Sequence, residues 1–124
     1  MLATIGCGVT PSEDHVDEAA DPITVVTNLA LNRPATQSSV GWNGVPSRAV
    51  DGNTDGNFFD NSVTHTNYEH QPYWQVDLGS STYIDTLELW NRTDCCSDRL
   101  NSSFIFYKDT PFVARLASDL INED

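Results

Sequence analysis

The stretch YWQVDLG, residues 73–79, decides the fold. Apolar and polar residues alternate along it, which puts Trp74, Val76 and Leu78 on one face of an extended segment. A second stretch, YIDTLELWN at residues 83–91, follows after a short gap and is again rich in β-branched, aromatic and aliphatic residues. The two stretches therefore predict consecutive strands.

Two further segments predict strands on either side of this pair. SSFIFYKD, residues 102–109, places Phe104 and Phe106 on one face. NLALNRPATQSS, residues 28–39, predicts an edge strand and a turn, because Pro34 lacks the N–H that a central strand needs. Short strands separated by turns are typical of an antiparallel β-sandwich or barrel, so the sequence predicts an all-β fold.

The two ends of the chain and its middle show no clear strand pattern. Residues 40–73 are dense in Gly, Asn, Asp and Pro, which predicts a long loop of the kind that is often functional. Residues 1–27 are acidic and predict a disordered tail, so the domain is expected at residues 28–124. The last segment, 111–124, predicts a weak helical turn or a loop. Because a closed sandwich has about eight strands, we expect a domain that is truncated at its C-terminus.

Charge and hydropathy exclude several classes of function. Eighteen acidic residues against six basic ones give a net charge of −12, which repels nucleic acids and anionic membranes. No apolar run approaches the roughly 18 to 20 residues that span a bilayer, so membrane insertion is not expected. The opening residues, MLATIGC, resemble the cleavage end of a bacterial lipoprotein signal, and the alternative is an incidental thiol at Cys7 in a disordered tail.

Two adjacent cysteines lie in the stretch NRTDCCSDR, residues 91–99. They predict a disulfide between neighbours, two free thiols or half of a zinc site, and no nearby ligands favour zinc. Such a disulfide closes almost no chain and would stabilise the fold little, which points to a role at the surface.

Two arginines, Arg92 and Arg99, flank the cysteines, and each carries five donors in a planar fork. Asp94 and Asp98 can each accept from an arginine and cancel its charge, which favours a neutral polyol as ligand. The alternative is a surface ion-pair cluster that contributes little.

Spacing connects this stretch to His65. Twenty-six residues separate His65 from Arg92, Asp94 follows two residues later, and four residues then precede Arg99. This arrangement resembles the sugar-binding motif of the F-type lectins, the fucolectins related to eel agglutinin. The resemblance covers about residues 28–112, and it implies a discoidin-like jelly-roll sandwich that is incomplete at the C-terminus.

The resemblance also implies roles for individual residues. His65, Arg92 and Arg99 correspond to the polar triad that hydrogen-bonds α-L-fucose, and a Cys95–Cys96 disulfide corresponds to the platform beneath the sugar ring. Asp94 and Asp98 would orient the arginines. The resemblance places Phe58 and Phe59 at the pocket for the 6-methyl group, with core packing as the alternative.

A metal site is implied by the stretch DGNTDG, residues 51–56, which reads like the first half of an EF-hand loop. The twelfth position is Ser62 and not Glu, so an EF-hand is rejected. The resemblance implies a structural calcium held by Asp51, Asn53, Ser62 and the carbonyl of Arg48. Its other ligands are expected from a C-terminal segment that this chain lacks, so an Asx-rich turn without metal is the alternative.

The sequence therefore predicts a fucose-binding lectin domain that is not an enzyme and is secreted or attached to a cell surface. Its partners would be fucosylated glycans, and oligomers or tandem domains would raise its avidity. The alternatives are an accessory domain of a larger secreted glycosidase, a discoidin-like adhesion or membrane-binding module, and a fragment without a stable fold. Catalysis of glycoside hydrolysis would need two carboxylates about 5 to 10 Å apart.

Overall fold

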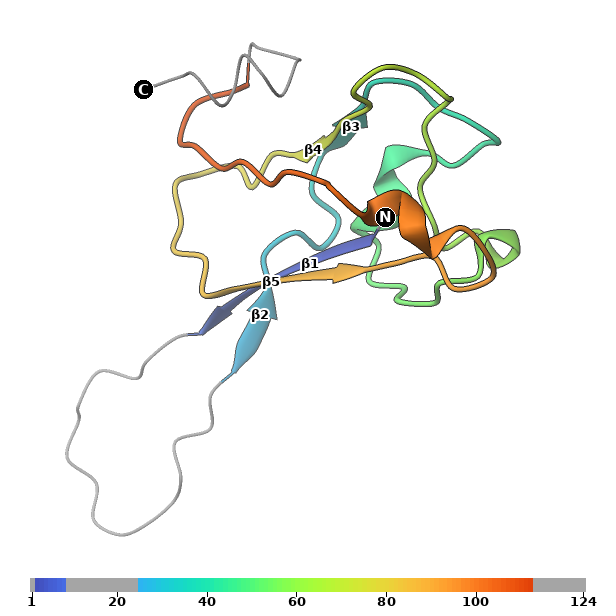
Figure 1. The fold of residues 1–124 in the computed structure, drawn as a ribbon. Coiled ribbons are helices and arrows are strands. Elements are labelled where there is room, and N and C mark those ends of the chain that lie inside the picture. Colours follow the sequence, from blue (N-terminus) through green and yellow to red (C-terminus); the bar gives the residue numbers. More distant parts are fainter. Residues whose placement is uncertain (1, 9–24, 113–124) are drawn as a thin grey trace, which may run out of the picture.

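The computed structural model describes residues 2–8, as backbone, and residues 25–112. The described elements are short strands and single 3-10 turns (Figure 1). The strands are β1 (Leu2–Gly8), β2 (Val26–Asn28), β3 (Ala35–Gln37), β4 (Trp74–Val76) and β5 (Thr86–Trp90). Three 3-10 turns are η1 (Pro46–Ala49), η2 (Phe58–Asp60) and η3 (Ser97–Leu100). None of the helices in this part of the chain is long and apolar enough to span a bilayer.

All strand pairs are antiparallel, which confirms the predicted all-β class. One sheet has the order β2-β1-β5, in which Leu2 lies opposite Trp90 and Gly6 lies opposite Thr86. The second sheet pairs β3 with β4. Figure 1 shows the two sheets at different ends of the fold, with the loop of residues 40–73 on the same side as η3.

The N-terminal segment differs from the prediction of a disordered tail over residues 1–27. Leu2–Gly8 forms the central strand of the three-stranded sheet, and Val26–Asn28 pairs with it. The prediction rested on the acidic composition of residues 13–21, whereas residues 1–8 carry no charged side chain and can join a sheet. The rest of the predicted tail, and the helical turn predicted within residues 111–124, lie largely outside the described residues.

The core lies beneath the shorter sheet and confirms the predicted face of residues 73–79. Ala30 and Val50 are buried, and Trp74, Val76 and Leu78 pack against them. The indole Nε1 of Trp74 is satisfied by the carbonyl of Pro46, at 3.0 Å. Burial of this face fixes the register of β4 beneath the long loop.

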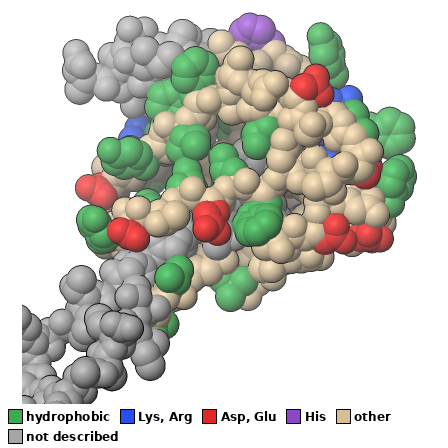
Figure 2. Space-filling view, turned by 60° about the horizontal axis from the view of Figure 1, so that its bottom comes forward, with side chains coloured by type: hydrophobic (Ala, Val, Ile, Leu, Met, Phe, Trp, Pro, Cys, Tyr) green, Lys and Arg blue, Asp and Glu red, His purple; other side chains and the backbone are tan. Residues whose placement is uncertain are grey.

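The strand predicted at residues 102–109 does not form, although the one predicted at residues 83–91 does. The Phe104 and Phe106 rings lie on the same side, stacked at 6.3 Å, as an extended segment requires. No strand among those described pairs with them, and Phe104 is 66% exposed. Figure 2 shows apolar side chains at many points on one face of the molecule.

The long loop is ordered by its own side chains. Asp51 Oδ1 accepts from the Asn53 amide, Asn53 Oδ1 from the Asp55 amide, and Asp55 Oδ1 from the Asn57 amide, at 2.8 to 3.0 Å. Asn57 Oδ1 then caps η2 by accepting from the amide of Phe59. These consecutive Asx turns give residues 51–59 a fixed path without strand or α-helix.

Candidate functional site

His65 is held by a turn at residues 41–44. The Gly41 amide donates to the His65 carbonyl at 2.8 Å, and the His65 amide donates to the Gly44 carbonyl at 2.9 Å. A Cβ added at Gly44 would lie 2.5 Å from the backbone nitrogen of His65, so a glycine is required for this close approach. The turn and the histidine are therefore positioned together.

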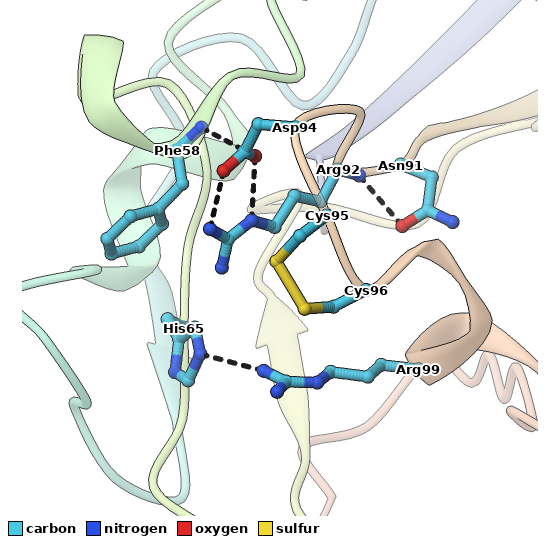
Figure 3. The surroundings of a disulfide bond; sticks show 8 residues. All are labelled: Phe58, His65, Asn91, Arg92, Asp94, Cys95, Cys96 and Arg99. Carbon is cyan, nitrogen blue, oxygen red and sulfur yellow. Dashed lines mark hydrogen bonds and ion pairs between the residues drawn. A yellow bond between two sulfur atoms is a disulfide. The ribbon is translucent and has the colours of Figure 1, made fainter.

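The surroundings of the His65 ring indicate its tautomer. Nδ1 lies 2.5 Å from the carbonyl of Thr66, which can only accept, so Nδ1 carries the proton. Nε2 lies 3.3 Å from Nη1 of Arg99, which can only donate. A neutral imidazole with the proton on Nδ1 satisfies both contacts, as Figure 3 shows for the Arg99 side.

Arg92 is fixed by a two-point ion pair with Asp94. Nε and Nη2 donate to Oδ1 and Oδ2 at 2.7 and 2.6 Å. Asp94 Oδ1 also accepts from the amide of Phe58, which ties η2 to this loop. The hydrogen bond to Arg92 holds the pKa of the Asp94 carboxyl well below its usual range, and the same pair raises the pKa of Arg92.

The two phenylalanines have different surroundings. Phe58 lies beneath the guanidinium of Arg92, with Cζ 4.6 Å from the ring centroid, and meets His65 edge to face at 5.6 Å. Phe59 contacts Phe58 at 5.9 Å but is 79% exposed. The structure therefore brings Phe58 to the predicted cluster and leaves Phe59 at its edge.

A disulfide joins Cys95 to Cys96, so the two sulfurs are neither free thiols nor zinc ligands in this structure. Cys96 has a φ of 57° and caps η3, the turn that carries Arg99. Figure 3 shows the disulfide between Arg92 and Arg99, facing the same space as His65 and Phe58. The bond thus forms one wall of the site.

Asp98 does not take the predicted place beside an arginine. Its carbonyl accepts from the amide of Asn101, and within residues 25–112 its carboxylate pairs with neither Arg92 nor Arg99. Among residues 25–112 no carboxylate forms an ion pair with Arg99, whereas Asp94 pairs with Arg92.

The side chain of Asn91, to which the sequence assigned no role in the site, holds the loop of residues 91–97, which we call the cysteine loop, through two hydrogen bonds. Its Nδ2 donates to the carbonyl of Ser97 at 2.7 Å, and its Oδ1 accepts from the amide of Arg92 at 2.8 Å. The Thr93 amide donates to the Gly56 carbonyl, which joins the cysteine loop to the Asx-rich loop. An Asn just before Arg-x-Asp is a signal that sequence reasoning could have used.

An open hollow of about 630 Å³ lies between these segments. Its lining contains three predicted ligands and one cysteine of the disulfide, together with several aromatic residues. The predicted residues in the lining are His65, Arg92, Cys96 and Arg99, and the aromatic ones are Trp42, Tyr68, Tyr73 and Trp74. Neither Phe58 nor Phe59 lines the hollow, so both lie behind or beside it.

The residues predicted to hold calcium take part in the hydrogen bonds of the long loop, and the calcium site stays a prediction. Asp51 and Asn53 already accept backbone amides in the Asx turns, and the buried Ser62 hydroxyl donates to the Asn57 carbonyl. Arg48 donates to Asn61 Oδ1 at 2.8 Å. Across residues 25–112 no three His, Cys, Asp or Glu side chains gather to hold a metal. Calcium takes six to eight oxygen ligands, and this set includes one carboxylate.

Comparison with known proteins finds similar proteins in eels and in a frog. It is 37% identical to a fucolectin of Anguilla anguilla over 83 residues, and 31% identical to a pentraxin fusion protein of Xenopus laevis over 72 residues. These matches cover 63% and 58% of this chain, and 52% and 17% of the two relatives. The chain spans about half the length of the eel fucolectins that it matches.

Two solved structures share higher identity over shorter segments. A fucose-binding module of Streptococcus pneumoniae is 54% identical, and the lectin domain of lectinolysin in complex with Lewis B antigen is 50% identical. Each match covers 44% of this chain and 38% of the other, with a TM-score of 0.43.

A family model described as a NedA-like, galactose-binding domain matches residues 48–115. This segment contains His65, both arginines and the disulfide. Because it takes up more than half of the 124 residues, the chain belongs to the family of NedA-like galactose-binding domains.

Proposed function

We propose that the protein is a carbohydrate-binding lectin domain that recognises terminal α-L-fucose. The observation that carries this proposal is the convergence of His65, Arg92, Arg99 and the Cys95–Cys96 disulfide on one hollow. The relatives named fucolectins, and the fucose-binding module of Streptococcus pneumoniae, support fucose as the sugar.

The hydrogen-bonding capacity of the site suits a polyol. Asp94 occupies one edge of the Arg92 guanidinium, which leaves the other N–H groups for a ligand. Arg99 contacts only the acceptor nitrogen of His65 among the residues described, so most of its five donors remain available. Sugar hydroxyls can accept from both arginines, and they can also donate to His65 Nε2 in place of Arg99.

The apolar parts of the site suit the carbon-bearing edge of a pyranose ring. The disulfide presents a rigid, weakly polar surface between the two arginines. Phe58 contacts Arg92 and His65 but does not line the hollow, so its role at the 6-methyl group of fucose stays a prediction. Phe59 stays a prediction for the same role, because most of its surface faces solvent.

A binding role fits the carboxylates better than catalysis does. Glu69 is the one carboxylate among the described residues that line the hollow, and it accepts from Ser38 and Ser39, whose hydroxyls lower its pKa. Glycoside hydrolysis commonly needs a second carboxylate about 5 to 10 Å away. Asp94 is committed to Arg92. We therefore assign no reaction to this domain.

We also propose that the protein works outside the cytosol, on a cell surface or in secreted form. Disulfides persist in oxidising compartments, and this disulfide forms part of the proposed site. A single open site binds weakly because each sugar hydrogen bond replaces one to water. Linking several domains, by oligomerisation or in tandem, would provide avidity.

We separately propose that the Asx-rich loop, residues 51–59, binds calcium only weakly in this chain. The four residues Arg48, Asp51, Asn53 and Ser62 supply too few free oxygens for a strong site, so we expect calorimetric titration with CaCl₂ to give a dissociation constant weaker than about 1 mM. Micromolar binding that is lost in Asp51→Asn would contradict this and make calcium a resident ion.

The proposed function is tested by titrating the protein with L-fucose, galactose and a sialylated glycan. The last is included because no carboxylate among the described residues pairs with Arg99, which could favour an acidic sugar. We expect heat with fucose that His65→Ala abolishes, and none of similar affinity with the others. Binding to galactose but not to fucose would overturn the assignment, and sedimentation with anionic vesicles would favour the membrane-binding alternative.

A further inference from the structure

We propose that Gln37 is a positioning residue for the His65 side of the site. Gln37 is the last residue of β3, and its amide joins three segments, of which the third is far from the first two in the sequence. These are the end of β3, the turn at residues 41–44, and residues 64–66, which carry His65. The inference rests on the proposed function only in treating His65 as part of a binding site.

The contacts of Gln37 use both ends of its amide. Nε2 donates toward the carbonyls of Ser39, Gly44 and His65, at 2.6, 3.0 and 3.0 Å. Oε1 accepts from the hydroxyl of Thr64, a buried residue. Because the three carbonyls can only accept, the amide nitrogen must face them and the amide oxygen must face Thr64, so the amide has one favoured orientation.

The residue type matters because of what surrounds it. Three carbonyl oxygens converge on one point, and the backbone amides nearby are already used: the Gly41 amide donates to His65 and the His65 amide donates to Gly44. A group with two protons is needed between the carbonyls. Glu at position 37 would have nearly the same shape but would place lone pairs against them.

The consequence reaches His65 through its backbone. The carbonyl of His65 accepts from both the Gly41 amide and the Gln37 side chain. The side chain of Gln37 therefore helps to fix the His65 backbone, and with it the position of the imidazole ring. That position determines the contact of Nδ1 with Thr66 and that of Nε2 with Arg99. Gln37 also lines the hollow, but its donors and its acceptor already form hydrogen bonds within the protein. We therefore expect Gln37 to affect sugar binding through the position of His65 and not by direct contact.

The experiment compares Gln37→Glu with a matched control, Gln75→Glu. Gln75 lies on the neighbouring strand β4, and its amide donates to the Thr36 hydroxyl at 2.9 Å, outside the hollow. Both variants add the same charge to the same sheet. Imidazole ¹⁵N signals report the tautomer of each histidine, and the exposed His70 serves as an internal reference.

We expect Gln37→Glu to shift the His65 signals, leave those of His70 in place and weaken fucose binding about tenfold, the size expected for losing one or two hydrogen bonds. Gln75→Glu should resemble the parent protein. Unchanged His65 signals and affinity in folded Gln37→Glu would overturn the proposal. If Gln37→Glu does not fold, Gln37→Met, which keeps the length of the side chain, gives the same reading.

Two other outcomes are also decisive. Unfolding of both Gln37 variants beside a folded Gln75→Glu would overturn the proposal, since Gln37 would then hold the whole fold and not His65 in particular. If the parent protein binds no fucose, the proposed function fails. The ¹⁵N signals of His65 would still decide whether Gln37 positions that ring.

Discussion

Among single side chains, Arg92 has the surroundings that depend most on its shape. Its planar fork meets Asp94 at two points while its face covers the ring of Phe58. A lysine keeps the charge but can neither pair at two points nor stack flat. The role of Arg92 is therefore one of geometry more than of charge.

We expect Arg92→Lys to weaken fucose binding at least about tenfold while the protein stays folded, since the loss of a charge-assisted hydrogen bond is worth about 1.5 to 3 kcal/mol. Calorimetric titration measures the affinity. Arg33→Lys is the matched control, because Arg33 is exposed, donates to the Leu29 carbonyl and does not line the hollow. Equal affinities for the two variants would refute the role of Arg92.

The Asp94 carboxyl makes a prediction about pH. Its pKa in the folded protein is lowered by Arg92, so its contribution to stability is fully present above the pKa of the unfolded chain, near 4, and is lost as pH falls toward the folded pKa. Thermal midpoints of the parent protein and Asp94→Asn should thus differ by a constant amount from pH 7 to about 5, and converge below about pH 4. A difference that grows on acidification would contradict this assignment.

At the scale of elements, the cysteine loop and η3 act as a unit whose shape is set by a bond between neighbours. A disulfide that closes so short a loop constrains the unfolded chain little. Its contribution should therefore appear in the site, where it separates the two arginines, and hardly in the stability of the fold.

Reduction of the disulfide should weaken fucose binding severalfold or more and lower the thermal midpoint by no more than about 4 °C, a shift that corresponds to roughly 1 kcal/mol. Mass spectrometry after alkylation confirms reduction, and titration with fucose measures the effect. Cys95→Ser/Cys96→Ser provides a variant without the bond. An affinity that survives complete reduction would remove the disulfide from the site.

The elements also show how far the sequence reaches. Alternation in residues 73–79 predicted β4 and its buried face, because that periodicity directly reflects one-sided burial. The same alternation around Phe104 predicted a strand that does not form, since a strand exists only where a neighbour accepts its hydrogen bonds. Leu2–Gly8 shows the converse: it forms a strand because it pairs with β5, about 80 residues away, and the residues around it give no signal of that pairing.

The candidate site was predictable where spacing and residue type matter and unpredictable where orientation does. The interval from His65 to Arg92 and Arg99 predicted a cluster that the structure brings together. Asp98 was assigned to an arginine, but among the described residues the arginine that forms an ion pair is Arg92, and its partner is Asp94. Gln37 escaped notice because its contacts span up to 28 residues and are formed by backbone carbonyls, which leave no trace in side-chain composition.

At the scale of the whole molecule, the described part of the chain has little core. Its buried apolar residues are Ala30, Ala49, Val50 and Val63, all small, whereas larger apolar side chains such as Phe104 are exposed. Hydrophobic burial is the main favourable contribution to folding, so a core of this size supports only low stability.

We therefore expect a free energy of unfolding at or below the lower end of the usual range of about 5 to 15 kcal/mol, together with strong binding of hydrophobic dyes to the native protein. Urea titration followed by circular dichroism measures the first, and dye fluorescence measures the second. Saturating fucose should raise the urea midpoint, because a ligand of the folded state stabilises it. A stability above about 10 kcal/mol would contradict the small core.

Trp42 has a consequence for how the molecule can be observed. It holds φ at 52° in the turn at residues 41–44, where a bulky residue is rare, and its indole is 81% exposed at the rim of the hollow. The other two tryptophans differ: Trp74 packs against the core, and Trp90 lies on β5 outside the hollow's lining. Because Trp42 is 81% exposed and Trp90 only 43%, acrylamide should quench Trp42 more strongly, and a ligand that shields Trp42 should reduce that quenching, which gives the protein a built-in optical reporter of what occupies its site.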